Sequence, residues 1–121
     1  MNKHSNLEIL KISDLQVDSI PESIGKCLNL KVLSITSCDN IEVIPDSLSK
    51  CTQLQQLEMA FCLNLRRIPS SIGKCRELHL LKIESDEDLD PLPEIDQCPQ
   101  LSELRLAVNN VEEVLREKGK C

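Results

Sequence analysis

Leucine and isoleucine recur along the chain in a fixed phrase, L-x-x-L-x-(L/I/M), whose last positions alternate with other side chains. The phrase occurs at residues 7–12, 30–35, 54–59, 78–83 and 101–106. Alternation with a period of two is typical of a strand that buries one face. We therefore predict five short strands in which Leu and Ile point to the core and the intervening side chains point the other way.

A second pattern occupies the segments between these predicted strands. Proline follows Ile or Leu at intervals of 24 residues, and the motifs SIGKC, SLSKC and SIGKC begin two residues after the first three prolines. Because proline fixes φ and suits the first turn of a helix, we predict a short helical segment through each motif. The preceding turns carry apolar residues that we expect to point inward, namely Ile41, Ile44, Leu65 and Ile68.

The repeated unit of 23 or 24 residues resembles the leucine-rich repeat family, over roughly residues 7–110. The motifs IPxSIGKC and IPxSLxKC look like the intracellular repeats of plant immune receptors, Ras-pathway scaffold proteins and effectors of intracellular bacteria. The resemblance implies an α/β leucine-rich repeat solenoid, a curved right-handed coil with a parallel sheet on its concave side and short helical or 3-10 segments on its convex side. It also implies recognition of a protein partner on the concave face.

We expect a single leucine-rich repeat domain, residues 1–121, with repeats starting near residues 7, 30, 54, 78 and 101. After the fifth repeat the pattern ends, and Asn110 is placed to cap a helix over residues 110–121 that closes the array. No matching cap precedes Leu7. An uncovered first strand leaves three interpretations open: residues 1–6 cover it, two chains meet there, or a longer parent protein has been cut.

The charge distribution limits the classes of partner. The chain has 121 residues and a net charge of −6, and seven acids but no Lys or Arg lie between Glu84 and Asp96. Elsewhere the charges nearly cancel, so no basic stripe is available for a nucleic acid or an anionic membrane. No apolar run approaches the ~20 residues of a membrane span, and the start MNKHSNLEIL lacks the apolar region of a signal peptide. We expect a cytoplasmic protein, or one secreted into a host cytoplasm.

The acidic tract allows three interpretations. The segment DEDLD at 86–90 places Asp at three positions of an EF-hand calcium loop. Pro91 and Gln97 stand where such a loop requires Gly and Glu, which argues against calcium. We interpret the tract as a solvated turn, with a patch for a basic partner as the alternative.

The cysteines follow the repeat. Cys27, Cys51, Cys75 and Cys98 lie 23 or 24 residues apart, and Cys38 and Cys62 form a second series with the same interval. In the family that the chain resembles, the first series replaces Leu, so we expect small buried hydrophobic residues. The second series stands where the family often has Asn, and a thiol can partly replace that donor. Metal or disulfide chemistry is the alternative, although no C-x-x-C pair occurs. Cys121 is expected to be exposed.

Catalysis is not expected. Nucleophilic catalysis needs a base within hydrogen-bond reach, and the two histidines are His4, near the N-terminus, and His79, which has no neighbouring acid in its own column of the predicted sheet. The phosphate-binding phrase G-x-x-x-x-G-K-[ST] is absent. We therefore predict no catalytic residue, cofactor or metal.

The concave strand face is the predicted recognition surface, because it mixes polar residues with apolar islands. Phe61, the single aromatic residue, stands in the eighth column of the repeat with Asp14, Ser37, Ser85 and Val108. It is interpreted either as an anchor for a partner or as a side chain that folds over the turn. The predicted partner-binding residues are Val32, Ser34, Gln56, Glu58, Phe61, Leu80, Lys82 and Arg105.

Two functions follow from the resemblance. The first is a non-enzymatic scaffold that binds a partner protein on its concave face, as a bacterial effector does inside a eukaryotic host. The alternative is a sensing or regulatory repeat fragment of a larger immune receptor or ubiquitin ligase. Either function implies a protein partner without nucleic acid or membrane, and a monomer or a weak dimer through the N-terminal edge.

Overall fold

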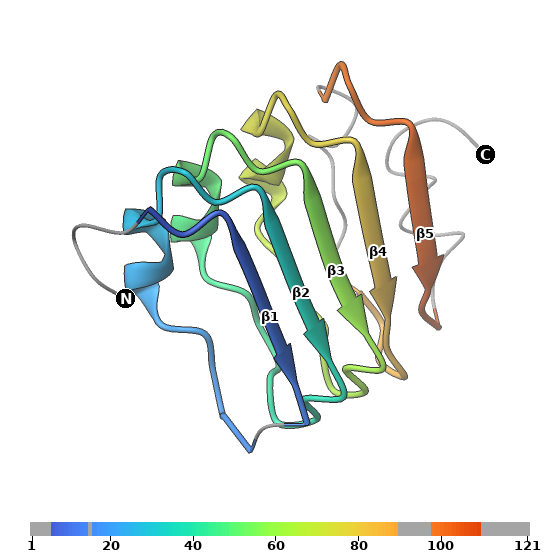
Figure 1. Ribbon diagram of the computed structural model, residues 1–121. Helices are drawn as coiled ribbons and strands as arrows, with labels where there is room; N and C mark the ends of the chain where they lie inside the picture. Colours follow the sequence, from blue (N-terminus) through green and yellow to red (C-terminus); the bar gives the residue numbers. More distant parts are fainter. Residues whose placement is uncertain (1–5, 15, 90–97, 110–121) are drawn as a thin grey trace.

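The computed structural model describes residues 6–14, 16–89 and 98–109. Within these residues the chain forms one open sheet of parallel strands that follow one another in sequence order (Figure 1). Each strand begins two residues after the first Leu of its phrase. The strands are β1 (Ile9–Ser13), β2 (Val32–Thr36), β3 (Gln56–Ala60), β4 (Leu80–Glu84) and β5 (Glu103–Ala107).

The strand register places equivalent positions of the repeats directly opposite one another. Leu33 pairs with Leu10 on one side and with Leu57 on the other, and the same relation continues to Leu81 and Leu104. Because neighbouring parallel strands lie about 4.8 Å apart, each position of the phrase forms a continuous column across the sheet. This arrangement fits the repeat architecture that the sequence predicts.

Short 3-10 helices lie on one side of the sheet (Figure 1). Those in the described residues are η1 (Glu22–Lys26), η2 (Asp46–Lys50) and η3 (Ser70–Lys74). The predicted helical segment through SIGKC is present, and Pro21 caps η1 in an extended conformation with φ −68° and ψ 150°. Its carbonyl accepts the first hydrogen bond of the turn, from Ile24 N at 3.0 Å. Proline thus supplies the acceptor that opens the helix.

Gly25 allows η1 and η2 to approach closely. A Cβ atom at this position would lie 2.8 Å from the backbone oxygen of Ser47 and 2.9 Å from its Cβ. These distances are shorter than van der Waals contact, so a side chain would force the two helices apart. The glycine of the first SIGKC motif is therefore a packing requirement.

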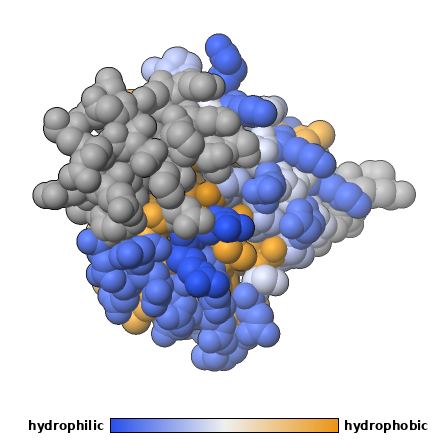
Figure 2. All heavy atoms as spheres, turned by 180° about the vertical axis from the view of Figure 1, so that it is seen from behind, coloured by the Kyte–Doolittle hydropathy of each residue, from blue (hydrophilic) through white to orange (hydrophobic). Residues whose placement is uncertain are grey.

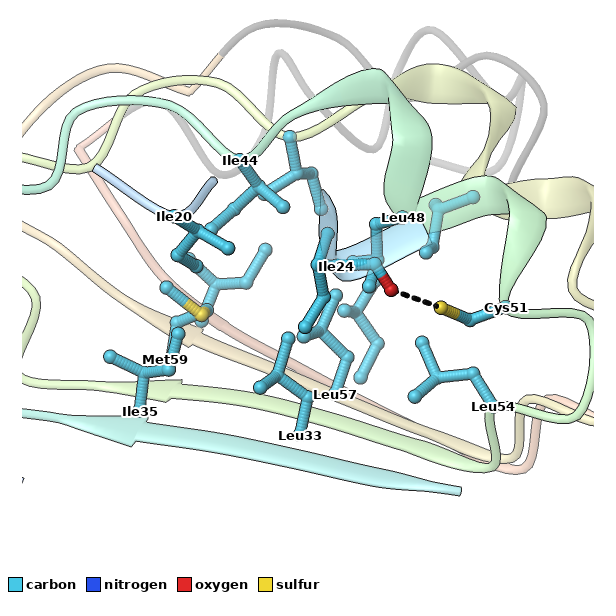
Figure 3. Close-up of a cluster of buried hydrophobic side chains, with 14 of the residues drawn as sticks. Ile20, Ile24, Leu33, Ile35, Ile44, Leu48, Cys51, Leu54, Leu57 and Met59 are labelled. Atoms are coloured by element: carbon cyan, nitrogen blue, oxygen red, sulfur yellow. Dashed lines mark hydrogen bonds between the residues drawn. The ribbon is translucent and has the colours of Figure 1, made fainter. Parts of the chain in front are cut away.

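The core lies between the sheet and the 3-10 helices (Figure 3). Leu33, Leu57 and Met59 project from the strands, and Ile24 and Leu48 project from the helices to meet them. All of these side chains are fully buried. The inward direction predicted for the turn residues is confirmed, with at most 2% exposure at Ile41, Ile44, Leu65 and Ile68. The repeats therefore share one continuous apolar layer.

The first cysteine series is buried, as predicted, but its thiols also make hydrogen bonds between repeats. Cys51 Sγ donates to Ile24 O at 3.3 Å (Figure 3), and Cys75 Sγ donates to Cys51 O at 3.5 Å. Cys98 Sγ lies 3.5 Å from Gly73 O. Burial, together with the neighbouring thiols, raises the pKa of Cys51 to about 11 and the pKa of Cys75 to about 12. These thiols therefore stay protonated at neutral pH and keep their donor hydrogen.

The second cysteine series fills the turns that follow β2 and β3. Cys38 Sγ donates to Thr36 O at 3.6 Å, and Cys62 Sγ lies 3.6 Å from Ile35 O. Both side chains are fully buried. The thiols thus act as the weak turn donors that the sequence predicts at a position where Asn is frequent.

The fourth repeat departs from this turn structure. Ser85 was expected in the surface column of Phe61, but it is only 7% exposed, whereas Asp86 lies at the surface. Ser85 Oγ donates to the backbone oxygens of Leu63, at 3.2 Å, and Leu65. Asp86 stands at the position of Cys38 and Cys62, and a carboxylate is costly to bury, so the Ser85 hydroxyl occupies the interior of this turn instead.

Several expectations fall on residues outside the described part. The predicted capping helix at 110–121, Cys121, and residues 90–97 of the acidic tract and calcium-like loop lie there. In the described ranges no helix is long and apolar enough to cross a membrane. Among the same residues no group of three or more His, Cys, Asp or Glu side chains is placed to hold a metal ion.

Seen from behind the sheet, the coloured surface is mostly hydrophilic, with hydrophobic residues in separate patches (Figure 2).

Candidate functional site

The candidate site is the sheet face that points away from the 3-10 helices, here called the open face. Alternate strand residues project from it, because the intervening Leu and Ile side chains point to the core. The register arranges these outward residues in rows. The first row is Ile9, Val32, Gln56, Leu80 and Glu103, and the second row is Lys11, Ser34, Glu58, Lys82 and Arg105.

The first row combines apolar side chains with one amide at its centre. Val32 and Leu80 are half-buried on either side of Gln56, and Ile9 at the edge strand is 56% exposed. No described element covers these side chains. Apolar residues that stay accessible beside a hydrogen-bonding amide are typical of the centre of a protein interface.

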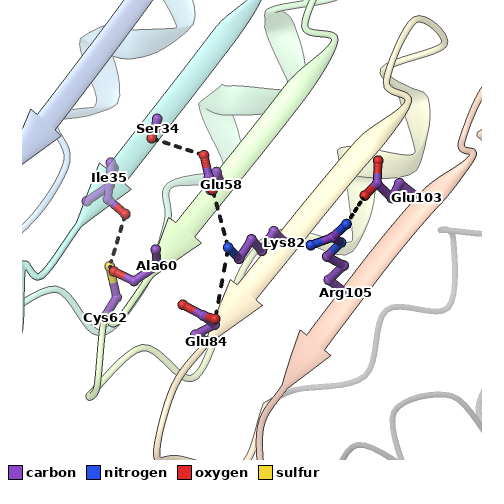
Figure 4. Close-up of polar contacts among 9 residues, drawn as sticks. All are labelled: Ser34, Ile35, Glu58, Ala60, Cys62, Lys82, Glu84, Glu103 and Arg105. Atoms are coloured by element: carbon purple, nitrogen blue, oxygen red, sulfur yellow. Dashed lines mark hydrogen bonds and ion pairs between the residues drawn. The ribbon is translucent and has the colours of Figure 1, made fainter.

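The second row contains a charged network that crosses three strands (Figure 4). Ser34 Oγ donates to Glu58 Oε1 at 3.3 Å, and Lys82 Nζ lies 3.6 Å from Glu58 Oε2. Lys82 Nζ also lies 4.0 Å from Glu84 Oε2. Partly exposed ion pairs of this kind contribute only about 0–1 kcal/mol each to stability. The network therefore fixes the direction of the side chains more than it stabilises the fold.

A hollow of about 320 Å³ lies at the β4 and β5 end of the open face. Its lining includes Lys82, Glu84, Arg105 and Ala107. Glu84 Oε1 is buried and has no hydrogen-bond partner among the described residues. A buried oxygen without a donor costs free energy, and the other oxygen of this carboxylate lies 4.0 Å from Lys82 Nζ.

The structure brings seven of the eight predicted site residues to the open face, in the two rows given above. Phe61 differs, because it stands in the turn after β3 with 59% of its surface exposed. Glu84 and Glu103 were not among the predicted site residues, although they pair with Lys82 and Arg105. Each acid lies two residues from its cation on the same strand, and this spacing is the sequence signal that could have identified them.

Comparison with known proteins supports the repeat assignment. Residues 29–51, the second repeat, match the family model described as Leucine Rich Repeat. No curated protein matches the chain. The family match and the open parallel sheet together support a leucine-rich repeat protein. Domains of this family generally mediate protein–protein interaction and are typically non-enzymatic.

Proposed function

We propose that this protein is a non-enzymatic scaffold that binds a partner protein on the open face, the concave face of the predicted solenoid. The observation that carries the proposal is that this face stays uncovered by the described elements while the opposite face is packed with core. Half-buried Val32 and Leu80 supply apolar contact area, and the ion network supplies oriented polar groups. Such a combination gives both affinity and orientation to an interface.

The proposed setting is a eukaryotic cytoplasm, reached by an effector of an intracellular bacterium. All six cysteines in the described residues are free thiols. Free buried thiols suit a reducing compartment, because disulfides persist mainly in oxidising ones. The resemblance of the SIGKC motifs to intracellular repeats supports the same setting.

The test compares partner capture by three forms of the protein. Leu80→Glu places a charge at the centre of the open face, whereas Leu28→Glu places the same charge at an exposed leucine beside η1. Immobilised proteins are incubated with eukaryotic cytosol, and quantitative mass spectrometry identifies the captured proteins. We expect Leu80→Glu to lose a partner at least tenfold while Leu28→Glu keeps it, since burying an unpaired charge costs more than ~1.4 kcal/mol.

Thermal unfolding followed by circular dichroism shows whether each variant remains folded. The proposal is wrong if a folded Leu80→Glu protein captures the same proteins in the same amounts as the wild type.

A further inference from the structure

Phe61 occupies a backbone position that does not suit it. Asp14, Ser37 and Phe61 each follow a strand directly, and their φ angles are 57°, 58° and 55°. Short polar residues tolerate this left-handed conformation, but a bulky residue is a genuine outlier there. The first two repeats follow that preference. The local backbone therefore does not explain why the third repeat carries phenylalanine.

The sheet also changes its hydrogen bonding at this point. After the other strands in the described part, the next N–H donates to the last carbonyl of the neighbouring strand at 2.9–3.0 Å. After β3 the donor is the residue that follows Phe61, since Cys62 N donates to Glu84 O at 3.1 Å. The pairing of β3 with β4 ends at Met59 and Ile83, one residue earlier than the other pairings. The turn at Phe61 thus departs from its neighbours in both sequence and structure.

Two apolar side chains are exposed in this turn. Phe61 is 59% exposed and Leu63 is 37% exposed. The equivalent residues of the second repeat are the polar Ser37 and Asp39. Covering apolar surface is favourable, so the exposed part of this pair is available for contact with a partner.

Acidic residues bracket the apolar pair on both sides. The backbone oxygen of Leu63 accepts a hydrogen bond from Asp86 N at 3.1 Å, and Asn64 Nδ2 donates to Asp39 O at 2.7 Å. These contacts fix the turns of the second and fourth repeats against the turn of the third. The exposed carboxylates that they bring there make no ion pair within the described part of the chain. They belong to Asp39, Asp86, Glu87 and Asp88.

A hollow of about 440 Å³ adjoins this turn at Asn64. Asp18 and Glu42 contribute carboxylates to its lining, and Val43 contributes an apolar surface. Glu42 also pairs with Arg66 at 3.1 Å, which leaves Asp18 as the acid in the hollow that has no ion-pair partner among the described residues. The hollow can therefore accept the end of a long basic side chain.

We propose that Phe61 and Leu63 anchor an extended basic segment of a partner protein, in which apolar side chains stand between Lys or Arg residues. The inference rests on the proposed function and names the chemistry of the partner. The apolar pair supplies the anchor, and the flanking carboxylates select cations and repel anions. The net charge of −6 opposes a second copy of the chain and a nucleic acid as occupants of this surface.

The test uses two short fluorescein-labelled peptides and fluorescence anisotropy. One peptide alternates Lys and Arg with Leu and Phe, and the other has Ser in place of Leu and Phe. The double variant Phe61→Ser, Leu63→Asp introduces the residues of the second repeat, which the same turn already accommodates. Leu28→Ser is the matched control, because Leu28 is a 58% exposed leucine beside η1.

We expect the wild type to bind the apolar peptide more tightly than the Ser peptide. The double variant should weaken this binding at least tenfold, since an anchor residue is worth more than ~1.4 kcal/mol, whereas Leu28→Ser should leave it within about twofold. The triple variant Asp86→Asn, Glu87→Gln, Asp88→Asn should also weaken it, and should reduce its dependence on salt.

Three outcomes would overturn the inference. The first is equal affinity of the double variant and the wild type. The second is equal affinity of the two peptides, which would mean simple attraction of charges. The third is a wild-type dimer in sedimentation velocity that the double variant abolishes, which would assign the surface to a second copy. Loss of partner capture by Leu80→Glu but not by the double variant would leave the proposed function standing and remove this inference alone.

Discussion

The first and the third repeats share one sequence pattern but differ in burial. In β3 the inward residues Leu57 and Met59 are completely buried, whereas the equivalent Leu10 and Ile12 of β1 are only partly buried. Among the described residues β1 pairs with β2 alone, and β3 pairs with a strand on each side. An apolar side chain is therefore buried by the two neighbouring repeats as much as by its own.

The largest effect should come from shortening an inward leucine in the third repeat and the equivalent leucine in the first repeat. Leu57→Ala removes a fully buried side chain and should lower the free energy of unfolding by about 2–5 kcal/mol. Leu10→Ala should lower the free energy of unfolding by less than half as much, because water already reaches this side chain. Urea denaturation followed by circular dichroism measures both values. Equal losses would show that the first repeat is covered as well as the third.

The second effect comes from the thiols of the interior repeats. Burial raises the pKa of Cys51 to about 11 and the pKa of Cys75 to about 12, from an ordinary value of 9.0. Above pH 9 the unfolded state binds fewer protons at these thiols than the folded state, so the free energy of unfolding falls as pH rises. Between about pH 8 and 10 the two thiols together should lower the free energy of unfolding by about 2 kcal/mol. Below about pH 8 they should not change it with pH.

Urea denaturation at a series of pH values, with a reducing agent, measures this dependence. Cys51→Ala should flatten part of the curve, since burial raises the pKa values of Cys75 and Cys62 as well. An identical curve for Cys51→Ala would show that this thiol does not control the alkaline loss.

The third effect concerns how the first repeat is held to the second. Gly25→Ala should lower the free energy of unfolding by about 1–2 kcal/mol, because the new Cβ would stand 2.8 Å from the Ser47 backbone oxygen. Ser49→Ala, at the equivalent position of the second repeat, should change it by less than about 0.5 kcal/mol, since a Cβ is already accommodated there. A stabilised Gly25→Ala protein would show that η1 and η2 are free to separate.

A smaller effect should distinguish an interior thiol from the thiol of the first repeat. Cys51→Ala should cost about 1 kcal/mol more than Cys27→Ala, because Cys51 Sγ donates to Ile24 O, whereas Cys27 Sγ makes no hydrogen bond in the described part of the chain. Cys51→Ser, which keeps a donor, should lose less than Cys51→Ala. Denaturation midpoints at neutral pH are sufficient to rank the three variants.

The smallest effect is expected on the open face. Lys82→Gln removes a cation from two partly exposed carboxylates and should change the free energy of unfolding by less than about 1 kcal/mol. High salt should reduce even this difference, because the charges are accessible to ions. A larger, salt-independent loss would mean that the network stabilises the fold, which would weaken its assignment to recognition.

The strands and the inward turn residues could be predicted because each depends on a repeat period that the sequence displays. The buried position of Ser85 could not be predicted, since it results from a shift of one residue inside a turn of unchanged length. The exposed position of Phe61 follows from its column, but its left-handed backbone could not be predicted, because bulky residues rarely adopt the conformation that Asp14 and Ser37 share with it. At the site, the rows of the open face follow from the register, and the spacing of two residues between Lys82 and Glu84 signals their pairing. The hydrogen bond from Ser34 to Glu58 depends on side-chain directions that a period does not specify.

The hydrogen bonds from side chains to the backbone share one direction between repeats. Cys51, Cys75, Ser85 and Asn109 each donate to a carbonyl of the repeat before their own. A unit duplicated within the gene would therefore bring side-chain donors for the carbonyls of the preceding unit. It would also bring carbonyls that accept hydrogen bonds from the side chains of the following unit. Such an array can gain or lose whole units during evolution without leaving a buried polar group unmatched, so the length of its binding surface can change while the fold stays intact.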